Sequence, residues 1–537
     1  MEKHFWWQEG VVYQIYPLSF MDSNNDGYGD LPGIASRLDY LQWLGINAIW
    51  ISPIYPSPLA DFGYDVSDYT GIHPLLGTME DFDRLLADCH ARGLKLILDF
   101  VPNHTSDQHP WFVESRSSRD NPRRNWYLWR DPGPDGKPPN NWLSVFGGSA
   151  WQWDETTRQY YLHSFLKEQP DLNWRNPEVQ KAMLDVMRFW LNKGVDGFRV
   201  DALWHIAKDE RFRDNPLNLG YVEGKMPPYE RFVGTHSGGQ PEVLDMVAMM
   251  RRVTDEYPER LLIGEIYLPV DKLVHYYGRA GNAGMHLPYN FQLILLPWRA
   301  RDIFTGITRY ETALPSFAWP NWVLGNHDKP RVASRVGRAQ ARIAALLLLT
   351  LRGTPTLYYG DEIGMLNGRI APEQVRDPVE KALAGLKQGR DPQRTPMQWS
   401  AAAHAGFSPA QPWLPVAGDY ERVNTEEQKR DDGSLLAFYR RLLALRQKEP
   451  ALRIGSYQPA GQKGNLLAFV REHQDTSFLV AVNLAGSRSR LAMPRHLNAA
   501  GEVVFATDPQ RIGARIKDQI KLGPDEGIVA RMQRDGD

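Results

Sequence analysis

The chain has 537 residues, a hydrophobic content of 42% and a formal net charge of -2. This length exceeds one compact domain of ordinary size, and the apolar content suffices for a large core plus at least one smaller domain. The near-zero charge gives no electrostatic footprint for nucleic acid or for an anionic membrane, so we expect neither as a partner.

Strand-like and helix-like segments alternate from the N-terminus onward. This rhythm predicts an α/β fold, and its regularity predicts a (β/α)8 TIM barrel. A closing helix is predicted after Ser434, whose side chain suits an N-cap. The predicted strands are 11–16, 48–51, 94–100, 197–200, 261–266, 322–324 and 354–359, and the predicted helices between them are 34–44, 79–91, 177–192, 242–256 and 339–351.

Two further units interrupt or follow the barrel. Residues 104–171, rich in Trp, Asn, Pro and Gly, form too long a connection for an ordinary loop and predict an inserted subdomain after the third strand. The barrel then comprises 1–103 and 172–450. From 451 to 537, short β-like runs separated by turn residues predict a C-terminal antiparallel β-sandwich domain.

Cysteine content and the longest apolar run bear on the compartment. Cys89 is the single cysteine, so an internal disulfide is excluded. The start MEKHFWWQEG lacks the basic and apolar regions of a signal peptide. Residues 343–351 form the most apolar stretch, far below the roughly 20 residues that span a bilayer. We expect a cytoplasmic protein that no membrane holds.

Four short segments place a carboxylate or a histidine just past a predicted strand. The carboxyl ends of barrel strands form one face, so these side chains should meet in one site. The segments are DFVPNHTS at 99–106, GFRVDA at 197–202, GEIY at 264–267 and GNHD at 325–328. In this order and spacing they resemble the conserved regions of the α-amylase family of glycoside hydrolases.

Asp201 and Glu265 are the best candidates for the pair of carboxyl groups that cleaves a glycosidic bond. Arg199 shares the side of the strand with Asp201, and its charge should favour an ionised nucleophile. Glu265 lies in the apolar run 261–266, where desolvation should keep it protonated as the general acid. Alone, the FRVD segment would equally suit a structural ion pair, but the other three segments favour catalysis.

The family resemblance implies roles for the remaining polar residues of these segments. By that resemblance Asp201 is the nucleophile, Glu265 is the acid/base and Asp328 stabilises the transition state. His327 and His104 are expected to hydrogen-bond the same sugar ring.

Four more segments resemble those of exo-acting α-glucosidases in the family: ADFGYDVSDY at 60–69, SVFGGSAW at 144–151, QPDLNW at 169–174 and RTPMQW at 394–399. A charged clamp at a closed end would turn an open cleft into a pocket for one sugar, because unmet buried charges penalise a longer chain. The resemblance implies that Asp61 and Arg394 clamp hydroxyls of the terminal glucose, Tyr64 and Phe146 pack on its ring, and Gln169 borders the pocket.

The residues after the nucleophile bear on linkage preference. Members that cleave α-1,6 bonds often carry valine directly after it, whereas Ala202 resembles the α-1,4-cleaving members. Trp204 and His205 depart from the Lys-His pair of endo-amylases, which leaves the leaving-group preference open.

The segment DSNNDGYGD at 22–30 alternates oxygen-bearing side chains around glycines, which suits a hard cation. It is no EF-hand, because Gly33 stands where the bidentate glutamate would be. The resemblance implies a structural Ca²⁺ or Mg²⁺ ion, and a polar turn without metal is the alternative. The implied ligands are Asp22, Asn24, Asp26, Asp30 and the carbonyl of Tyr28. No organic cofactor is expected.

These observations predict a retaining exo-α-glucosidase for short, α-1,4-linked, maltose-like glucosides, with transfer to other hydroxyl compounds as a side reaction. A trehalose- or sucrose-remodelling isomerase or transglucosylase of the same family is the close alternative. A non-catalytic sugar-binding relative is the alternative of another class, and the retention of all three carboxylates argues against it. We expect a monomer or homodimer.

Overall fold

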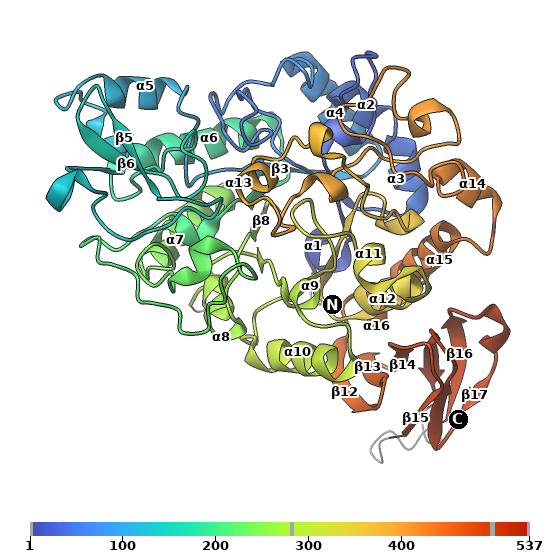
Figure 1. Ribbon diagram of the computed structural model, residues 1–537. Coiled ribbons are helices and arrows are strands. Elements are labelled where there is room, and N and C mark those ends of the chain that lie inside the picture. The colour runs from blue at the N-terminus through green and yellow to red at the C-terminus, as the bar shows by residue number, and fades with distance from the viewer. Residues whose placement is uncertain (1–3, 280–283, 494–499, 534–537) are drawn as a thin grey trace.

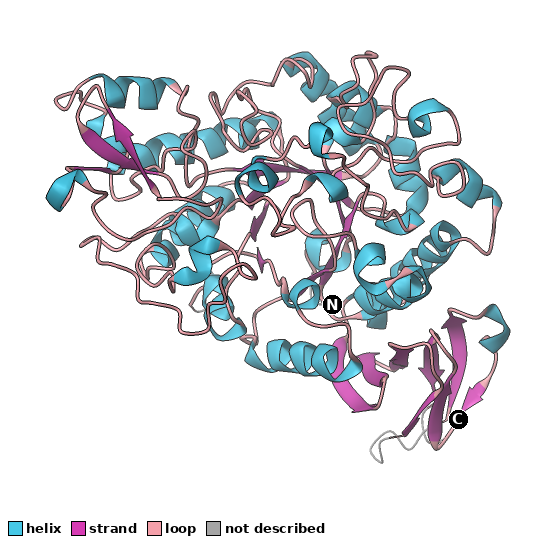
Figure 2. Cartoon of the chain, in the orientation of Figure 1, coloured by secondary structure: helices cyan, strands magenta, loops and turns pink. Residues whose placement is uncertain are grey.

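The computed structural model describes residues 4–279, 284–493 and 500–533. Its centre is a sheet of eight parallel strands that curls into a nearly closed barrel (Figures 1 and 2). The hydrogen-bonded order in the described residues is β10-β11-β1-β2-β3-β7-β8-β9. The strands are β1 Val12–Ile15, β2 Ala48–Ile51, β3 Lys95–Phe100, β7 Gly197–Val200, β8 Leu261–Gly264, β9 Leu287–Pro288, β10 Asn321–Val323 and β11 Thr354–Tyr358. The predicted barrel is confirmed.

Side chains bridge the seam between β9 and β10. The Asn321 amide donates a hydrogen bond to the Pro288 carbonyl, and its Oδ1 accepts one, 3.0 Å long, from the Asn290 N–H. The two strands at the ends of the sheet order are therefore joined through an asparagine.

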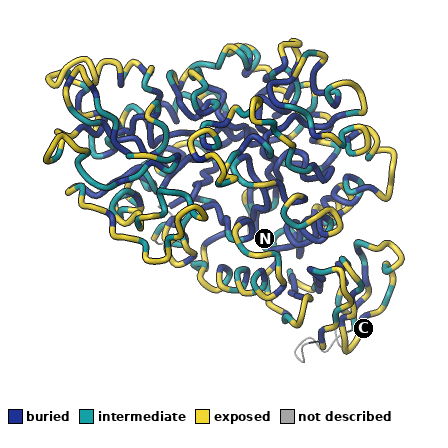
Figure 3. The backbone as a smooth tube through the Cα atoms, viewed as in Figure 1, coloured by how far each residue is buried: buried dark blue, intermediate teal, exposed yellow. Residues whose placement is uncertain are grey.

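Every residue of β1, β2, β7 and β8 is buried, because parallel strands are covered on both faces (Figure 3). One apolar cluster draws its side chains from alternate strand positions such as Val12, Trp50 and Ile263. A larger cluster packs the strands against the surrounding helices. The longer helices are α3 Leu38–Leu44, α4 Met79–Ala91, α6 Pro177–Lys193, α7 Val243–Asp255, α10 Ala300–Ala313, α12 Arg338–Thr350 and α15 Leu435–Lys448.

Short helices occupy many of the connections. They are α1 Trp6–Glu9, α2 Leu31–Ala35, α8 Val270–Leu273, α9 Gln292–Leu295, α11 Val332–Val336, α13 Pro378–Ala382, α14 Thr425–Arg430 and α16 Pro450–Arg453. Within the described ranges, no helix combines the length and the apolar character needed to cross a membrane.

A small unit lies between β3 and α6, where the insertion was predicted, and is seen at the upper left of Figure 1. It contains a helix and an antiparallel sheet with the order β4-β6-β5. Its elements are α5 Pro110–Ser117, β4 Trp129–Arg130, β5 Trp151–Asp154 and β6 Gln159–Leu162.

The C-terminal part forms an antiparallel sheet domain, at the lower right of Figure 1. Its described strands form one sheet with the order β12-β13-β14-β19-β16-β17 and a second sheet of β15 and β18. They are β12 Ser456–Lys463, β13 Leu466–His473, β14 Thr476–Asn483, β15 Ser489–Ala492, β16 Gly501–Ala506, β17 Arg515–Ile516, β18 Gln519–Leu522 and β19 Gly527–Met532. The domain boundaries stay predictions, and residues 1–3, 280–283, 494–499 and 534–537 within them lie outside the described residues.

Several predicted elements differ from the observed ones. The helix predicted over 34–44 is two helices, α2 and α3, because the backbone of Arg37 leaves the helical region (φ -111°, ψ 6°). Strand β9 was not predicted, since two residues carry no pattern. The N-cap at Ser434 is confirmed, because its side chain accepts a hydrogen bond from the Ala437 N–H.

Two buried arginines tie the C-terminal domain to the barrel. Arg471 on β13 donates hydrogen bonds to the carbonyls of Thr350, at the end of α12, and Leu452, at 2.5 and 3.0 Å. Arg446 on α15 donates to the carbonyls of Leu452 and Gly353, at 2.8 and 2.7 Å. These guanidinium groups thereby satisfy main-chain acceptors where helix and sheet meet.

We expect the substitution Arg471→Gln to lower the free energy of unfolding by about 3 kcal/mol or more, because buried carbonyls lose a charged donor. Urea titration followed by tryptophan fluorescence measures this. The control is Arg490→Gln, at an exposed position of β15, which should change stability little. Equal midpoints for the two variants would contradict the role assigned to Arg471.

Candidate active site

A cavity of about 630 Å³ opens at the carboxyl ends of the barrel strands, with further walls from the inserted unit and the long loops. The side chains predicted for the site directly after β7, β8 and β10 line it, namely those of Asp201, Glu265 and Asp328. The predicted residues that line the cavity are Asp61, Tyr64, His104, Phe146, Asp201, Ala202, Glu265, His327 and Asp328. Gln169, Arg199 and Arg394 are not among the lining residues and contact those that are.

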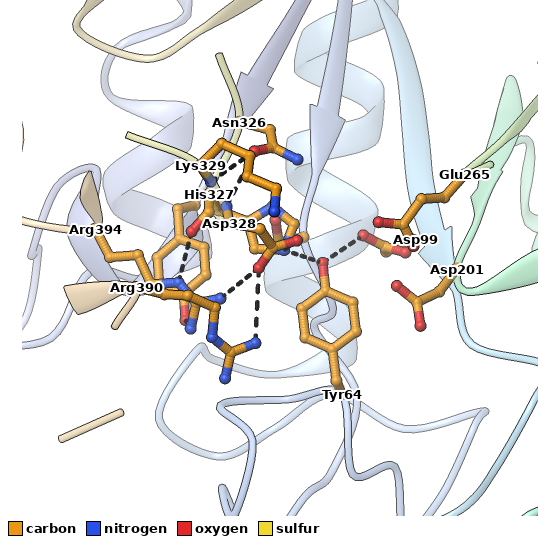
Figure 4. Close-up of polar contacts among 12 residues, drawn as sticks. Tyr64, Asp99, Asp201, Glu265, Asn326, His327, Asp328, Lys329, Arg390 and Arg394 are labelled. Atoms are coloured by element: carbon orange, nitrogen blue, oxygen red, sulfur yellow. Dashed lines mark hydrogen bonds and ion pairs between the residues drawn. The ribbon is translucent and has the colours of Figure 1, made fainter. Parts of the chain in front are cut away.

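Arg199 binds three carboxylates from three neighbouring strands. Its Nη1 lies 2.8 Å from Asp99 Oδ1 and 2.6 Å from Asp201 Oδ1, and its Nη2 lies 3.0 Å from Glu265 Oε2. The guanidinium is 1% exposed. Figure 4 shows Asp99, Asp201 and Glu265 together on one side of Tyr64. One buried cation therefore positions the predicted catalytic pair.

The surroundings of the two carboxylates differ less than the sequence predicts. Burial raises the pKa of Asp201 well above its usual value, and the charges of Glu265 and Asp99 add to this effect, whereas Arg199 opposes it. The predicted contact with Arg199 is present and favours the ionised form of Asp201 as predicted, but burial outweighs it, so the net pKa is raised. The predicted apolar setting of Glu265 is wrong, since its Oε2 pairs with Arg199 and accepts the Ala202 N–H at 2.9 Å.

Ala202 adopts a left-handed conformation, with φ of 45°. This region disfavours residues with a Cβ, so the turn stores some strain beside the predicted nucleophile. In return the Ala202 N–H points at Glu265, and the following residues Trp204 and His205 enter the lining of the cavity.

Asp328 stands opposite the catalytic pair. Its Oδ1 lies 2.9 Å from Arg394 Nη2 and 3.6 Å from Arg390 Nη1, and its Oδ2 lies 3.3 Å from His327 Nε2. Burial would raise the pKa of Asp328, but His327, Arg394 and Arg390 outweigh it and hold the pKa below the usual range. Asp328 is therefore an ionised carboxylate facing the cavity.

The clamp at the closed end uses a different arginine from the one predicted. Asp61 Oδ1 pairs with Arg390 Nη2 at 2.6 Å, whereas Arg394 is fully buried and faces Asp328. Asp377 also binds Arg390, at 2.8 Å, and the Phe146 ring lies 4.9 Å from its guanidinium carbon. Arg390 precedes Arg394 by four residues in RDPQR, and this doubling of arginine was the available signal.

Hydrogen bonds fix the aromatic and amide side chains around the closed end. The Tyr64 hydroxyl donates to Asp99 Oδ2 at 3.0 Å and lies 2.8 Å from His327 Nε2. The Gln169 amide lies 3.1 Å from His104 Nε2 and donates to Asp61 at 3.3 Å. Burial lowers the pKa of His104 to about 4, so its ring is neutral at pH 7.

Sequence reasoning missed the outer half of the cavity. It is lined mainly by the loop between β7 and α7, together with Tyr267, Leu295 and Lys329. After His205 this loop carries no recognisable motif, and its residues reach the site only through the path of the backbone. Its main lining residues are Asn215, Asn218, Pro227, Tyr229, Glu230, Phe232, Val233 and Ser237.

The loop at 22–30 is held by its own hydrogen bonds. Asp22 Oδ1 accepts the N–H groups of Asn24 and Asn25 at 3.0 and 2.8 Å, and Asp30 Oδ1 accepts the Gly33 N–H at 2.6 Å as the N-cap of α2. In the described part of the chain, no three His, Cys, Asp or Glu side chains converge as a metal site. The arrangement is thus a set of Asx turns, and the implied ion stays a prediction.

The substitution Arg199→Gln tests the electrostatic role of the guanidinium. Removing the positive charge should raise the pKa of Asp201 further, so the acid limb of the kcat/KM profile should move to higher pH by about 1 unit or more. The pH profile of α-glucoside turnover measures this shift. A profile that keeps its acid limb while only its height falls would contradict the assignment.

The barrel and the site together define a carboxylate-dependent enzyme that acts on glycosidic bonds. The family profile described as "Alpha amylase, catalytic domain" matches residues 14–455. The chain belongs to the α-amylase family of glycoside hydrolases.

Three similar proteins refine the comparison. The chain is 42% identical to a probable alpha-glucosidase of Rhizobium meliloti (strain 1021) over 506 residues, which cover 91% of each protein. Among solved structures, an alpha-glucosyl transfer enzyme is 41% identical with a TM-score of 0.93 and coverage of 99% and 100%. An isomaltulose synthase from Protaminobacter rubrum is 35% identical with a TM-score of 0.91 and the same coverage.

Proposed function

We propose that the protein is a retaining exo-α-glucosidase that removes one glucosyl unit from the non-reducing end of short, maltose-like α-glucosides. The observation that carries this proposal is the pairing of Asp201 and Glu265 on one guanidinium, opposite a closed end formed by Asp61 and Arg390.

The shared contact with Arg199 supports a double-displacement reaction. Two carboxyl groups that bind neighbouring nitrogens of one guanidinium stand close together, which suits the roughly 5 to 5.5 Å separation of retaining enzymes better than the wider gap of inverting ones. Asp201 attacks the anomeric carbon while Glu265 protonates the leaving oxygen. Glu265 then takes a proton from water, whose oxygen displaces Asp201.

The raised pKa of Asp201 bears on its role as nucleophile, because only the ionised carboxylate attacks. The first step needs an ionised Asp201 and a proton on Glu265. Burial disfavours two charges beside each other, and Arg199 supports one. Arg199 thus opposes the protonation of Asp201 that burial favours, as the ionised nucleophile of the first step requires.

The closed end supports exo action on a single sugar. Asp61, Arg390 and Asp328 present charged groups at the end of the pocket; the first two are buried, and the Asp328 side chain is 22% exposed. Hydroxyl groups of a terminal glucose can satisfy them, whereas a continuing chain would meet an ion pair held by Asp377.

An isomerase or transglucosylase is the second candidate, because the same glucosyl-enzyme intermediate can pass to another hydroxyl group instead of water. Two solved structures support this second candidate, because a glucosyl transfer enzyme and an isomaltulose synthase share the fold over nearly all of the chain. The two candidates differ in the acceptor and not in the catalytic pair.

A time course of products from maltose, isomaltose, sucrose and trehalose tests the proposal. We expect free α-glucose from maltose, and we expect Asp201→Asn to lower kcat by about 10⁴-fold or more, because the nucleophile is lost. Chromatography and the anomeric signals of early product measure both.

The control for this substitution is Asp135→Asn, an exposed aspartate of the inserted unit that should leave turnover unchanged. If a rearranged disaccharide were the main product, the protein would be an isomerase and the hydrolase proposal would be wrong. An initial β-glucose product, or full activity of Asp201→Asn, would refute the retaining mechanism proposed here.

We further propose that the loop at 22–30 takes up Ca²⁺ or Mg²⁺ as a structural ion. The support is its donor chemistry, since Asn24 and Asp26 are exposed and a carboxylate or amide oxygen that accepts one N–H keeps a second lone pair. A cytoplasmic location and a monomeric or homodimeric state are also proposed, and the single, buried Cys89 suits a reducing compartment.

Thermal unfolding with and without the ion tests the metal proposal. Binding should stabilise the fold by about 2.7 kcal/mol at an ion concentration one hundred times Kd, and a chelator should reverse it. Asp26→Asn keeps an acceptor oxygen for the Tyr28 N–H but removes charge, so it should weaken the effect of the ion alone. A melting temperature indifferent to Ca²⁺, Mg²⁺ and chelator would exclude a structural ion.

A further inference from the structure

The outer half of the cavity is bordered by residues 216–233, which we name the acceptor arm. The arm folds back on itself like a hairpin, since the Val233 N–H donates to the Pro216 carbonyl at 2.8 Å and the Asn218 N–H donates to the Arg231 carbonyl at 2.9 Å. Leu217 pairs with Phe232 across it. The arm is thus a defined structure beside the site.

Asn215 anchors the base of the arm to the inserted unit and to the rest of its own loop. Its backbone N–H and carbonyl both bond to the side-chain amide of Asn141, at 2.8 and 2.9 Å. Its own side chain donates to Ser237 Oγ at 3.0 Å and accepts the His236 N–H at 2.8 Å. These four hydrogen bonds hold the arm in place over the cavity.

Exposed apolar side chains concentrate on this arm. Of the nine large hydrophobic side chains that are exposed among the described residues, four belong to it, and a fifth, Leu295, lines the same cavity. Val233 is 49% and Leu295 is 55% exposed, and both line the cavity together with Phe232. Leu217, Leu219 and Val222 lie outside the cavity lining, so Phe232, Val233 and Leu295 supply the apolar surface here. Such surface in a pocket marks a place where an apolar partner is desolvated.

Aromatic rings continue this surface inward toward the acid/base residue. Tyr267 follows Glu265 by two residues, stacks on Phe291 at 4.0 Å between ring centroids and contacts Trp204 at 5.6 Å. Phe165 lines the cavity on the side of the inserted unit. The ion pairs of Asp61, Arg390 and Asp328, in contrast, gather at the closed end. Figure 4 shows Arg390 and Asp328 on the other side of Tyr64 from Asp201 and Glu265.

We propose that the outer half of the cavity receives an apolar aglycone, an aryl or alkyl alcohol, both as leaving group and as acceptor, and that the acceptor arm with Leu295 sets this preference. The inference rests on the proposed function, because it needs the glucosyl-enzyme intermediate on Asp201. In the transfer step the alcohol gives its proton to Glu265, its oxygen bonds the anomeric carbon, and the ester bond to Asp201 breaks with its electrons returning to the carboxylate.

A competition between two acceptors tests the inference. Maltose supplies the glucosyl unit, and equal concentrations of benzyl alcohol and glycerol compete for one intermediate, so their product ratio is independent of the donor step. We expect at least about tenfold more benzyl glucoside than glycerol glucoside per molar acceptor, and we expect Phe232→Ser with Leu295→Ser to reduce this ratio about tenfold. Mass spectrometry of the two glucosides measures it.

Ile512→Ser is the matched control, since Ile512 is 53% exposed on the C-terminal domain and should leave the ratio unchanged. A wild-type ratio near one, or an equal ratio in wild type and the arm variant, would overturn the inference while glucose release from maltose still upheld the proposed function. A wild type that consumes neither maltose nor sucrose would overturn both.

Discussion

The active site depends on one buried guanidinium. Arg199 contacts carboxylates that arise from β3, β7 and β8, so it sets both the spacing of Asp201 and Glu265 and the charge that they can carry together. Burying such a group costs several kcal/mol unless good partners surround it. Here two of the partners are the catalytic carboxyl groups. The same ion pairs therefore stabilise the mouth of the barrel and hold the catalytic groups in place.

Two further arginines organise the carboxylates at the closed end. Arg390 and Arg394 divide the work there, because the first joins Asp61 to Asp377 while the second holds Asp328 from behind. Asp328 stays ionised, whereas Asp201 is pushed toward protonation, although both face the same cavity. The pKa values differ because Asp328 contacts two arginines, whereas Asp201 contacts one. The cavity lies between these two carboxylates.

Residues next to a strand end were predictable, whereas residues brought in by irregular loops were not. The barrel, its catalytic face and the three carboxylates follow from strand patterns and short motifs; the structure confirms the barrel, and the family comparison confirms the family. The electrostatics of Glu265 could not be read from its apolar neighbours, because in a strand those neighbours point elsewhere. Arg390 was overlooked beside Arg394, and the acceptor arm has no motif, so its position required coordinates.

The closure of the barrel has a consequence for how sequence change acts on it. Between adjacent strands of the barrel sheet, main-chain hydrogen bonds form whatever the side chains are. Across the seam of β9 and β10, in the part of the chain that the structure describes, the join passes through the amide of Asn321. Most substitutions in the strands therefore alter side-chain packing and leave the barrel closed. A substitution of Asn321 instead removes the hydrogen bonds that close the barrel between β9 and β10.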